Sequence, residues 1–117
     1  MSDRLLKLND LLRDETARAI QEELDFEAGI IVTVTRADVS PTLENANIKL
    51  SIYPESKSTE VLEAVNKKIY EIQQVLNSRL KMRPVPKIRF ELDRSEEKAE
   101  KVEKIFDKIS SQGAVPE

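Results

Sequence analysis

The spacing of hydrophobic positions along the chain predicts a succession of helices and strands. Apolar residues recur every three or four positions over residues 3–25, with charged residues between them, which predicts an amphipathic helix. Residues 30–35 are rich in β-branched side chains, and residues 46–53 alternate apolar and polar, so both segments predict strands. The connection between them is short and contains Pro41, so we expect these strands to form an antiparallel pair.

The second half of the chain also changes from the helical spacing of apolar residues to the alternation of a strand. A helical stripe of apolar residues begins at Thr59 and runs for about 20 residues until Pro84 ends it. Alternation over residues 86–92 predicts a third strand, and an apolar stripe after Ser95 predicts a last helix. The predicted order is therefore α-β-β-α-β-α. It indicates an α+β domain in which a three-stranded sheet carries helices on one face.

The length and composition fit one small folded domain. The chain has 117 residues, of which 39% are hydrophobic and 35% charged, and compact domains most often have about 100–150 residues. We expect residues 1–112 to form a single domain and residues 113–117 a short tail. No stretch approaches the roughly 18–20 apolar residues of a membrane span, and residues 1–7 do not resemble a signal peptide. We therefore expect a cytoplasmic protein that does not bind a membrane.

The residue types needed for most catalytic and metal sites are missing. The chain has no Cys, His or Trp, which excludes disulfides, Cys/His zinc sites and nucleophiles activated by histidine. Neither glycine belongs to a phosphate-binding loop, and no EF-hand spacing occurs. Asp38 and Asp93 lie near predicted strand ends, but neither has an evident partner. We expect no enzymatic activity, no cofactor, no metal and no small-molecule substrate.

A basic run contrasts with the formal net charge of −3. The segment from residue 79 to residue 90 contains no acidic residue and carries the cations Arg79, Lys81, Arg83, Lys87 and Arg89. Lys67 and Lys68 extend this patch toward the second predicted helix. A patch of this kind neutralises phosphates and releases counterions, which indicates RNA binding. The alternative is that these cations stabilise a helix C-terminus and protect an edge strand from aggregation.

The outward face of the predicted sheet is polar and basic. Alternation places there the side chains of Thr33, Thr35, Asn47, Lys49, Ser51 and Arg89. Tyr53 is the only aromatic residue expected on this face, whereas sheets that bind RNA by base stacking present several. The pattern therefore favours contacts with the RNA backbone or shape over base stacking on the sheet.

The order of several short segments resembles the bacterial ribosome-binding factor A family, a small KH-like domain of the type II arrangement. The likeness rests on residues of the first helix and on the segments 32–35, 48–52, 80–83 and 88–93, and it covers roughly residues 4–109. The resemblance implies a protein that binds the immature 30S ribosomal subunit and contacts 16S rRNA. It also implies help in late maturation and rRNA end processing, with no enzymatic activity.

The resemblance makes the basic run and Lys67–Lys68 the expected contacts with rRNA phosphates. We also expect a monomer, because nothing in the sequence demands a dimer. The alternative hypothesis is a protein–protein interaction module that uses the acidic helices without touching RNA.

One departure from the family concerns the second predicted helix. The family has an Ala-x-Gly kink between two helices, which by spacing falls near residues 68–70, but this chain has no glycine between Gly29 and Gly113. We therefore expect the second helix to be straighter, or to bend near Asn77 and Ser78 instead. We assign no RNA contact to the kink motif itself.

Overall fold

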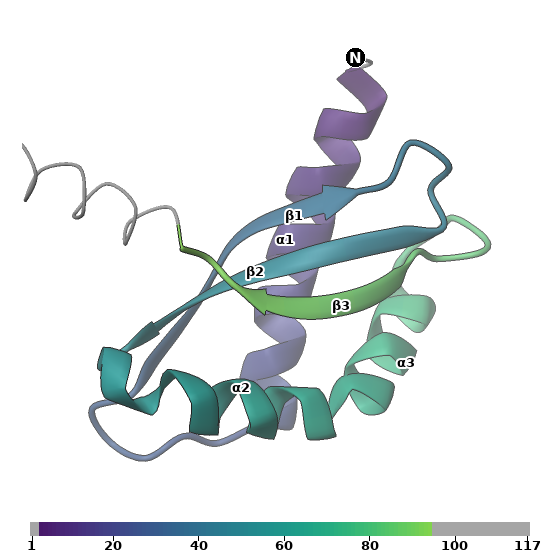
Figure 1. Cartoon of the computed structure of the whole chain (residues 1–117). Helices are drawn as coiled ribbons and strands as arrows, with labels where there is room; N and C mark the ends of the chain where they lie inside the picture. Colours follow the sequence, from purple (N-terminus) through teal and green to yellow (C-terminus); the bar gives the residue numbers. More distant parts are fainter. Residues whose placement is uncertain (1–2, 95–117) are drawn as a thin grey trace, which may run out of the picture.

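The computed structural model describes residues 3–94, and Figure 1 shows them as helices packed against a small sheet. The elements in chain order are α1 (Asp3–Glu23), β1 (Ile31–Val39), β2 (Asn45–Tyr53), the 3-10 helix η1 (Glu55–Lys57), α2 (Ser58–Lys67), α3 (Ile69–Arg79) and β3 (Lys87–Leu92). The predicted succession of helices and strands is confirmed as far as β3. The last helix predicted after Ser95, and the tail predicted at residues 113–117, lie outside the described residues.

The three strands form a mixed sheet in the order β1-β2-β3. β1 and β2 are antiparallel, as predicted from their short connection, with Ile31 opposite Tyr53 and Val39 opposite Ala46. β3 runs parallel to β2, with Ala46 beside Ile88. A parallel pair needs a long crossover connection, and α2 and α3 supply it. β3 is thereby an edge strand of the sheet.

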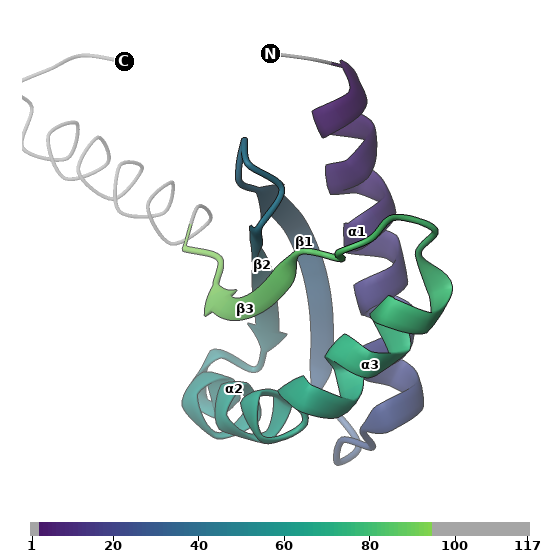
Figure 2. The same ribbon diagram turned by 90° about the vertical axis from the view of Figure 1, so that its right-hand side faces the viewer.

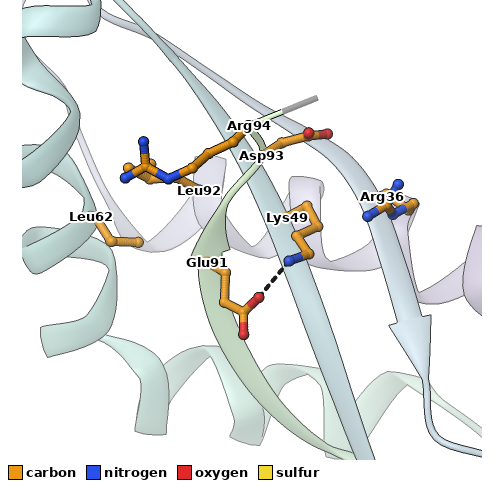
Figure 3. Close-up of a pocket in the computed structure, with 7 residues that line it drawn as sticks. All are labelled: Arg36, Lys49, Leu62, Glu91, Leu92, Asp93 and Arg94. Carbon is orange, nitrogen blue, oxygen red and sulfur yellow. Dashed lines mark hydrogen bonds and ion pairs between the residues drawn. The ribbon is translucent and has the colours of Figure 1, made fainter. Parts of the chain in front are cut away.

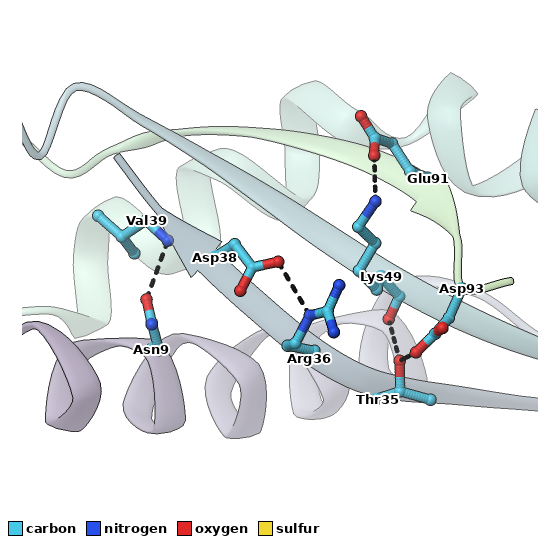
Figure 4. Close-up of polar contacts among 8 residues, drawn as sticks. All are labelled: Asn9, Thr35, Arg36, Asp38, Val39, Lys49, Glu91 and Asp93. Carbon is cyan, nitrogen blue, oxygen red and sulfur yellow. Dashed lines mark hydrogen bonds and ion pairs between the residues drawn. The ribbon is translucent and has the colours of Figure 1, made fainter. Parts of the chain in front are cut away.

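The helices cover one face of the sheet, as the sequence predicts. Figure 2 shows α1 and α3 next to each other on the same side of the sheet, with α2 beneath the lower end of the sheet. The largest fully buried side chains between helices and sheet include Leu12, Ile48, Leu50, Val65, Ile72 and Leu76. The side-chain amide oxygen of Asn9 also accepts a hydrogen bond from the backbone N–H of Val39, at 2.9 Å, and so ties α1 to the end of β1 (Figure 4).

β1 is longer than predicted because a bulge interrupts its alternation. The register shifts between Val34 and Arg36, so Thr35 and Arg36 are both exposed. Beyond the bulge the alternation resumes, and Ala37 and Val39 are buried. Two successive polar residues end a period-two pattern in the sequence, which is why the prediction stopped at residue 35.

The expectation that the second helix is straighter, or bends near Asn77 and Ser78, is wrong, because the structure breaks this helix at Lys68. α2 ends at Lys67 and α3 begins at Ile69, and Lys68 between them has φ −102° and ψ 9°. The break thus falls near the expected family kink and not at Asn77–Ser78, which lie within α3. A negative φ is open to any residue, so this break does not need a glycine. The buried residues keep helical spacing across it, so their periodicity could not reveal it.

Candidate nucleic-acid interface

The structure places the seven predicted RNA-contacting cations at the two ends of α3, in the loop that follows it and in β3. Lys67 and Lys68 lie at the break before this helix, and Arg79 is its last residue. The remaining cations follow in the loop after α3 and in β3. The helix has 11 residues, so at 1.5 Å per residue its ends lie about 16 Å apart. The length of α3 therefore separates Lys67 and Lys68 from Arg79.

Arg79 is engaged with acidic residues of α1. Its Nη2 atom donates a hydrogen bond to Oε1 of Glu22, and its Nη1 atom lies 3.8 Å from Oε1 of Glu15. Only 32% of its side chain is exposed. This guanidinium joins the C-terminal end of α3 to α1, and its charge is largely balanced within the protein.

Arg83 is folded back on the loop that follows α3. Its Nη1 atom donates hydrogen bonds of 2.6 Å to the backbone oxygens of Leu80 and Met82. Val85 and Pro86, further along the loop, are buried. A guanidinium has five N–H donors, so Arg83 retains donors for a phosphate while it shapes the loop.

Lys81, Lys87 and Arg89 are exposed cations that make no ion pair within residues 3–94, and we call them the basic trio. Lys81 lies in the loop, while Lys87 and Arg89 point to the open face of the sheet from alternate positions of β3. The backbone N–H of Lys87 also donates to the carbonyl oxygen of Glu44, at 3.0 Å, which fixes the start of β3 against β2.

Gln73 fixes the same region from α3, a role that no pattern in the sequence indicates. Its Nε2 atom donates to the carbonyl oxygen of Pro86 at 3.1 Å, and its Oε1 atom accepts from the N–H of Ile88 at 2.9 Å. The side-chain amide thus pairs with the outer edge of β3 as a neighbouring strand would. A second Nε2 hydrogen bond, to Asn77 at 3.2 Å, holds the amide in place.

The open face of the sheet is polar, as predicted, but its charges are mostly paired. Arg36 donates to Asp38 at 2.9 Å, and Lys49 donates to Glu91 on the neighbouring strand (Figure 4). The hydrogen bond from Lys49 lowers the pKa of the Glu91 carboxyl, and the charges of Lys49 and Arg89 lower it further, although partial burial opposes them. This face is therefore less basic than the sequence suggested.

The strand-end carboxylates, for which no partner was evident, do have partners. Asp38 accepts from Arg36 on its own strand, and Asp93 accepts a hydrogen bond from the hydroxyl of Thr35 on β1. The bulge brings Thr35 and Arg36 to the open face together, and the sequence pattern did not predict it. Both carboxylates therefore have hydrogen-bond partners on β1.

An open hollow of about 430 Å³ lies beside these pairs (Figure 3). Its lining comprises Arg36, Lys49, Leu62, Glu91, Leu92, Asp93 and Arg94. Figure 3 shows Lys49 and Glu91 directed toward each other, so two of its charged groups satisfy each other. In the described part of the chain, no group of three or more acidic side chains is placed to hold a metal ion.

Tyr70, the second residue of α3, is a further surface residue that the sequence reading passed over. Its side chain is 69% exposed, more than any other large hydrophobic residue among those described. It directly follows the break that carries Lys67 and Lys68. The signal in the sequence was its position, since Tyr70 falls outside the apolar stripe formed by Val65, Ile72 and Leu76.

Within residues 3–94 no helix combines the length and apolar character required to cross a bilayer.

Comparison with known proteins identifies close sequence relatives. The sequence model of a family described as Ribosome-binding factor A matches residues 4–106. A protein of Thermomicrobium roseum named ribosome-binding factor A is 37% identical over 112 residues, which cover 95% of this chain and 87% of that protein. The matched relative is thus similar along almost its whole length.

Solved structures share the fold. The crystal structure of ribosome-binding factor A from Thermus thermophilus matches with a TM-score of 0.67 at 21% identity, covering 78% of this chain and 97% of that one. A homology model of the Thermus protein, fitted into a cryo-EM map of its complex with the 30S subunit, matches with a TM-score of 0.60 at 20% identity, covering 74% of this chain and 91% of that one. At this level of identity the likeness shows the arrangement of helices and strands.

Proposed function

This chain belongs to the ribosome-binding factor A family, and from that membership we propose that it binds the immature 30S ribosomal subunit. We further propose that it contacts 16S rRNA directly and assists late maturation of the subunit, including processing of the rRNA ends. In this role it acts in the cytoplasm as a monomer, by binding and without catalysing a reaction.

The basic trio is the observation that carries the proposal, because it lies on a chain that belongs to this family. Lys81, Lys87 and Arg89 are exposed, carry no ion pair among the described residues and follow one another along a loop and strand that are held from two sides. Cations without internal partners are the ones that can neutralise phosphates and release counterions. The Thermus protein fitted into the 30S complex supports the choice of partner.

The seven predicted cations have different roles in this proposal. The basic trio makes the main phosphate contacts, and Lys67 with Lys68 forms a second contact at the other end of α3. Arg83 contributes the donors that the loop backbone leaves free. Arg79 acts mainly by holding α3 to α1, since Glu22 and Glu15 already balance its charge.

Sucrose-gradient sedimentation with purified 30S precursor particles tests the proposal. In the trio variant, Lys81→Gln, Lys87→Gln and Arg89→Gln remove three positive charges without adding negative ones. The α1 control variant removes the same charge through Arg4→Gln, Lys7→Gln and Arg18→Gln, all exposed positions on α1. We expect the wild-type chain and the α1 control to co-sediment with the precursor, and the trio variant to remain at the top of the gradient.

The alternative outcomes are distinct. A wild-type chain that stays away from free 30S subunits and their precursors refutes ribosome binding altogether. A trio variant that folds normally and co-sediments as well as the wild type refutes the RNA contact. That second result would favour the alternative hypothesis, a protein–protein interaction module that uses the acidic helices without direct RNA contact.

A further inference from the structure

The hydrophobic core is only partly covered at the carboxyl end of β3. Along the inward side of this strand Ile88 and Phe90 are buried, whereas Leu92 is only partly buried. Leu62 of α2, next to the buried Val61, is also only partly buried. Both leucines pack against the core and line the open hollow of Figure 3. The core therefore presents part of its apolar surface to solvent at this end.

The edge of β2 is also uncovered beside this hollow. β3 ends opposite Leu50, where the N–H of Asp93 donates to the carbonyl oxygen of Leu50 at 2.7 Å. Residues 51–53 of β2 continue beyond that point and pair only with β1 in the described part of the chain. A second hollow, of about 640 Å³, lies along them and the first turn of α2. Leu92, Asp93 and Arg94 line both hollows, so the two adjoin, and together we call them the β3-end hollow.

The chain itself supplies an apolar segment that starts at this hollow. The described residues end at Arg94, which lines it, and residues 95–117 follow outside the described part. Four apolar residues at helical spacing occur in that segment: Val102, Ile105, Phe106 and Ile109. Their spacing predicts one apolar stripe on a helix. A helix with such a stripe is stable when it buries the stripe against another element.

The length of the chain suits a contact within one molecule. Val102 comes eight positions after Arg94, which corresponds to about 12 Å along a helix. The stripe needs no long loop to reach the hollow, so little chain entropy is lost on docking. A second copy would bring the same stripe only by losing the freedom of a separate molecule. These lengths therefore favour the chain's own segment as the occupant.

The charges around the hollow argue against a strongly charged occupant such as nucleic acid. Lys49 and Glu91 satisfy each other (Figure 3), and Arg36 lies 2.9 Å from Asp38. The apolar side chains and the strand edge remain for a contact. In the segment after Arg94, helical spacing places two acids along one side of the stripe and two lysines along the other: Glu103, Asp107, Lys101 and Lys108. An apolar stripe between charges of both signs suits such a surface.

We propose that residues 95–109 dock their apolar stripe in the β3-end hollow. Val102 then lies toward Leu62 and Leu92, and Phe106 lies farther along, beside residues 51–53 and the first turn of α2. The docked segment covers the two leucines and the open edge of β2, and so closes the core at this end. The contact is a property of the free chain, so its test does not depend on ribosome binding.

Tryptophan fluorescence of the full chain tests whether the stripe is covered, because the chain has no Trp of its own. The indole of a Phe106→Trp variant reports the stripe, and that of an Ala114→Trp variant reports the chain beyond it. We expect the Phe106→Trp variant to emit at shorter wavelength and to be quenched less by acrylamide. Equal emission and equal quenching in the two variants would overturn the docking.

A nitroxide label tests where the stripe docks, because the chain also has no Cys. A label on Thr59→Cys sits at an exposed position that lines the hollow, and the control label on Lys7→Cys sits at an exposed position of α1. A nitroxide quenches an indole at short range, so only the first label should quench the Phe106→Trp variant, and equally at every protein concentration. Absent quenching, or equal quenching by both labels, overturns the site. Quenching that disappears on dilution shows docking between two copies and overturns the contact within one chain.

Two further substitutions in the Phe106→Trp chain test the apolar contact. Leu62→Gln removes one apolar side chain from the hollow, and we expect about a 10- to 100-fold fall in the docking equilibrium constant, seen as stronger acrylamide quenching. Leu6→Gln makes the same change at an exposed position of α1 and should leave the quenching unchanged. Unchanged quenching in a Leu62→Gln variant with native circular dichroism overturns the placement. If Leu62→Gln does not fold, the nitroxide pair decides.

Discussion

Gln73 offers the sharpest test of how the protein positions its basic trio. Its side-chain amide donates to the carbonyl oxygen of Pro86 and accepts from the N–H of Ile88, so it joins α3 to the first residues of β3. Gln73→Ala removes both hydrogen bonds and leaves two backbone groups of a partly buried segment without that partner. We expect the variant to be less stable and the loop between α3 and β3 to lose its fixed position.

The expected loss in the free energy of unfolding follows from the two hydrogen bonds between Gln73 and the segment of Pro86 and Ile88. Each contributes about 0.5–1.5 kcal/mol net, so the bridge stabilises the fold by about 1–3 kcal/mol. Gln74 provides a matched control, because it is the next residue of the same helix and is exposed. Gln74→Ala makes the same change in side chain and helix propensity without touching β3. The difference between the two variants therefore reports the bridge together with the hydrogen bond from Gln73 to Asn77.

Urea unfolding followed by circular dichroism measures this difference. With an m-value of about 2 kcal/mol per molar, in the middle of the range for a small domain, Gln73→Ala should lower the midpoint by about 0.5–1.5 M relative to Gln74→Ala. Gln73→Glu keeps the acceptor for Ile88 but cannot donate to Pro86 when ionised, so we expect it to fall between Gln73→Ala and the wild type. Equal midpoints for Gln73→Ala and Gln74→Ala would refute the bridge.

Three further predictions concern charge. The trio variant should lower the slope of log affinity for single-stranded RNA against log salt by about 2, since each phosphate contact contributes about 0.7, and an unchanged slope in a salt titration would contradict the three contacts. Arg79→Gln should leave that slope unchanged but cost up to about 1 kcal/mol in urea unfolding, the value of a partly exposed ion pair, and a reduced slope would show that Arg79 contacts RNA. Because Lys49 lowers the pKa of folded Glu91, the pair stabilises the fold above the ordinary glutamate pKa of about 4.3, and this stabilisation is lost as the pH falls through the lower folded value. Lys49→Met should reduce this loss of stability in urea-unfolding midpoints measured from pH 7 to pH 3. An unchanged dependence of the midpoint on pH would argue against the pair.

The sequence predicted those parts of the fold that depend on local periodicity. The stripe of α1, the antiparallel pair and β3 all follow from spacings that bury one face. The break at Lys68 could not be predicted, because Val61, Val65, Ile72 and Leu76 keep helical spacing on both sides of it. The bulge at Thr35 was missed for the opposite reason, since it breaks a periodicity that resumes one residue later.

The candidate site was predictable as a set of residue types but not as an arrangement. Arg79 and Lys81 are two positions apart in a uniformly basic run, yet the structure pairs only Arg79 with an acid. Its partner Glu22 is 57 residues away, so no local pattern could separate the paired cation from the free one. Gln73 and Ile88 pose the same difficulty, because a hydrogen bond between a helix and a distant edge strand leaves no trace in either segment.

These long-range contacts explain how a chain of net charge −3 can present a basic contact. Acidic residues of α1 balance Arg79, and Glu91 balances Lys49, while the basic trio keeps its charge for a partner. Backbone hydrogen bonds from β3 to β2, together with the Gln73 bridge, hold Lys87 and Arg89 in place before binding. A positioned cation loses less conformational freedom when it meets a phosphate, so fewer charges suffice for a specific contact. Position and charge therefore contribute separately: removing the bridge weakens binding at every salt concentration, whereas removing the cations also weakens its dependence on salt.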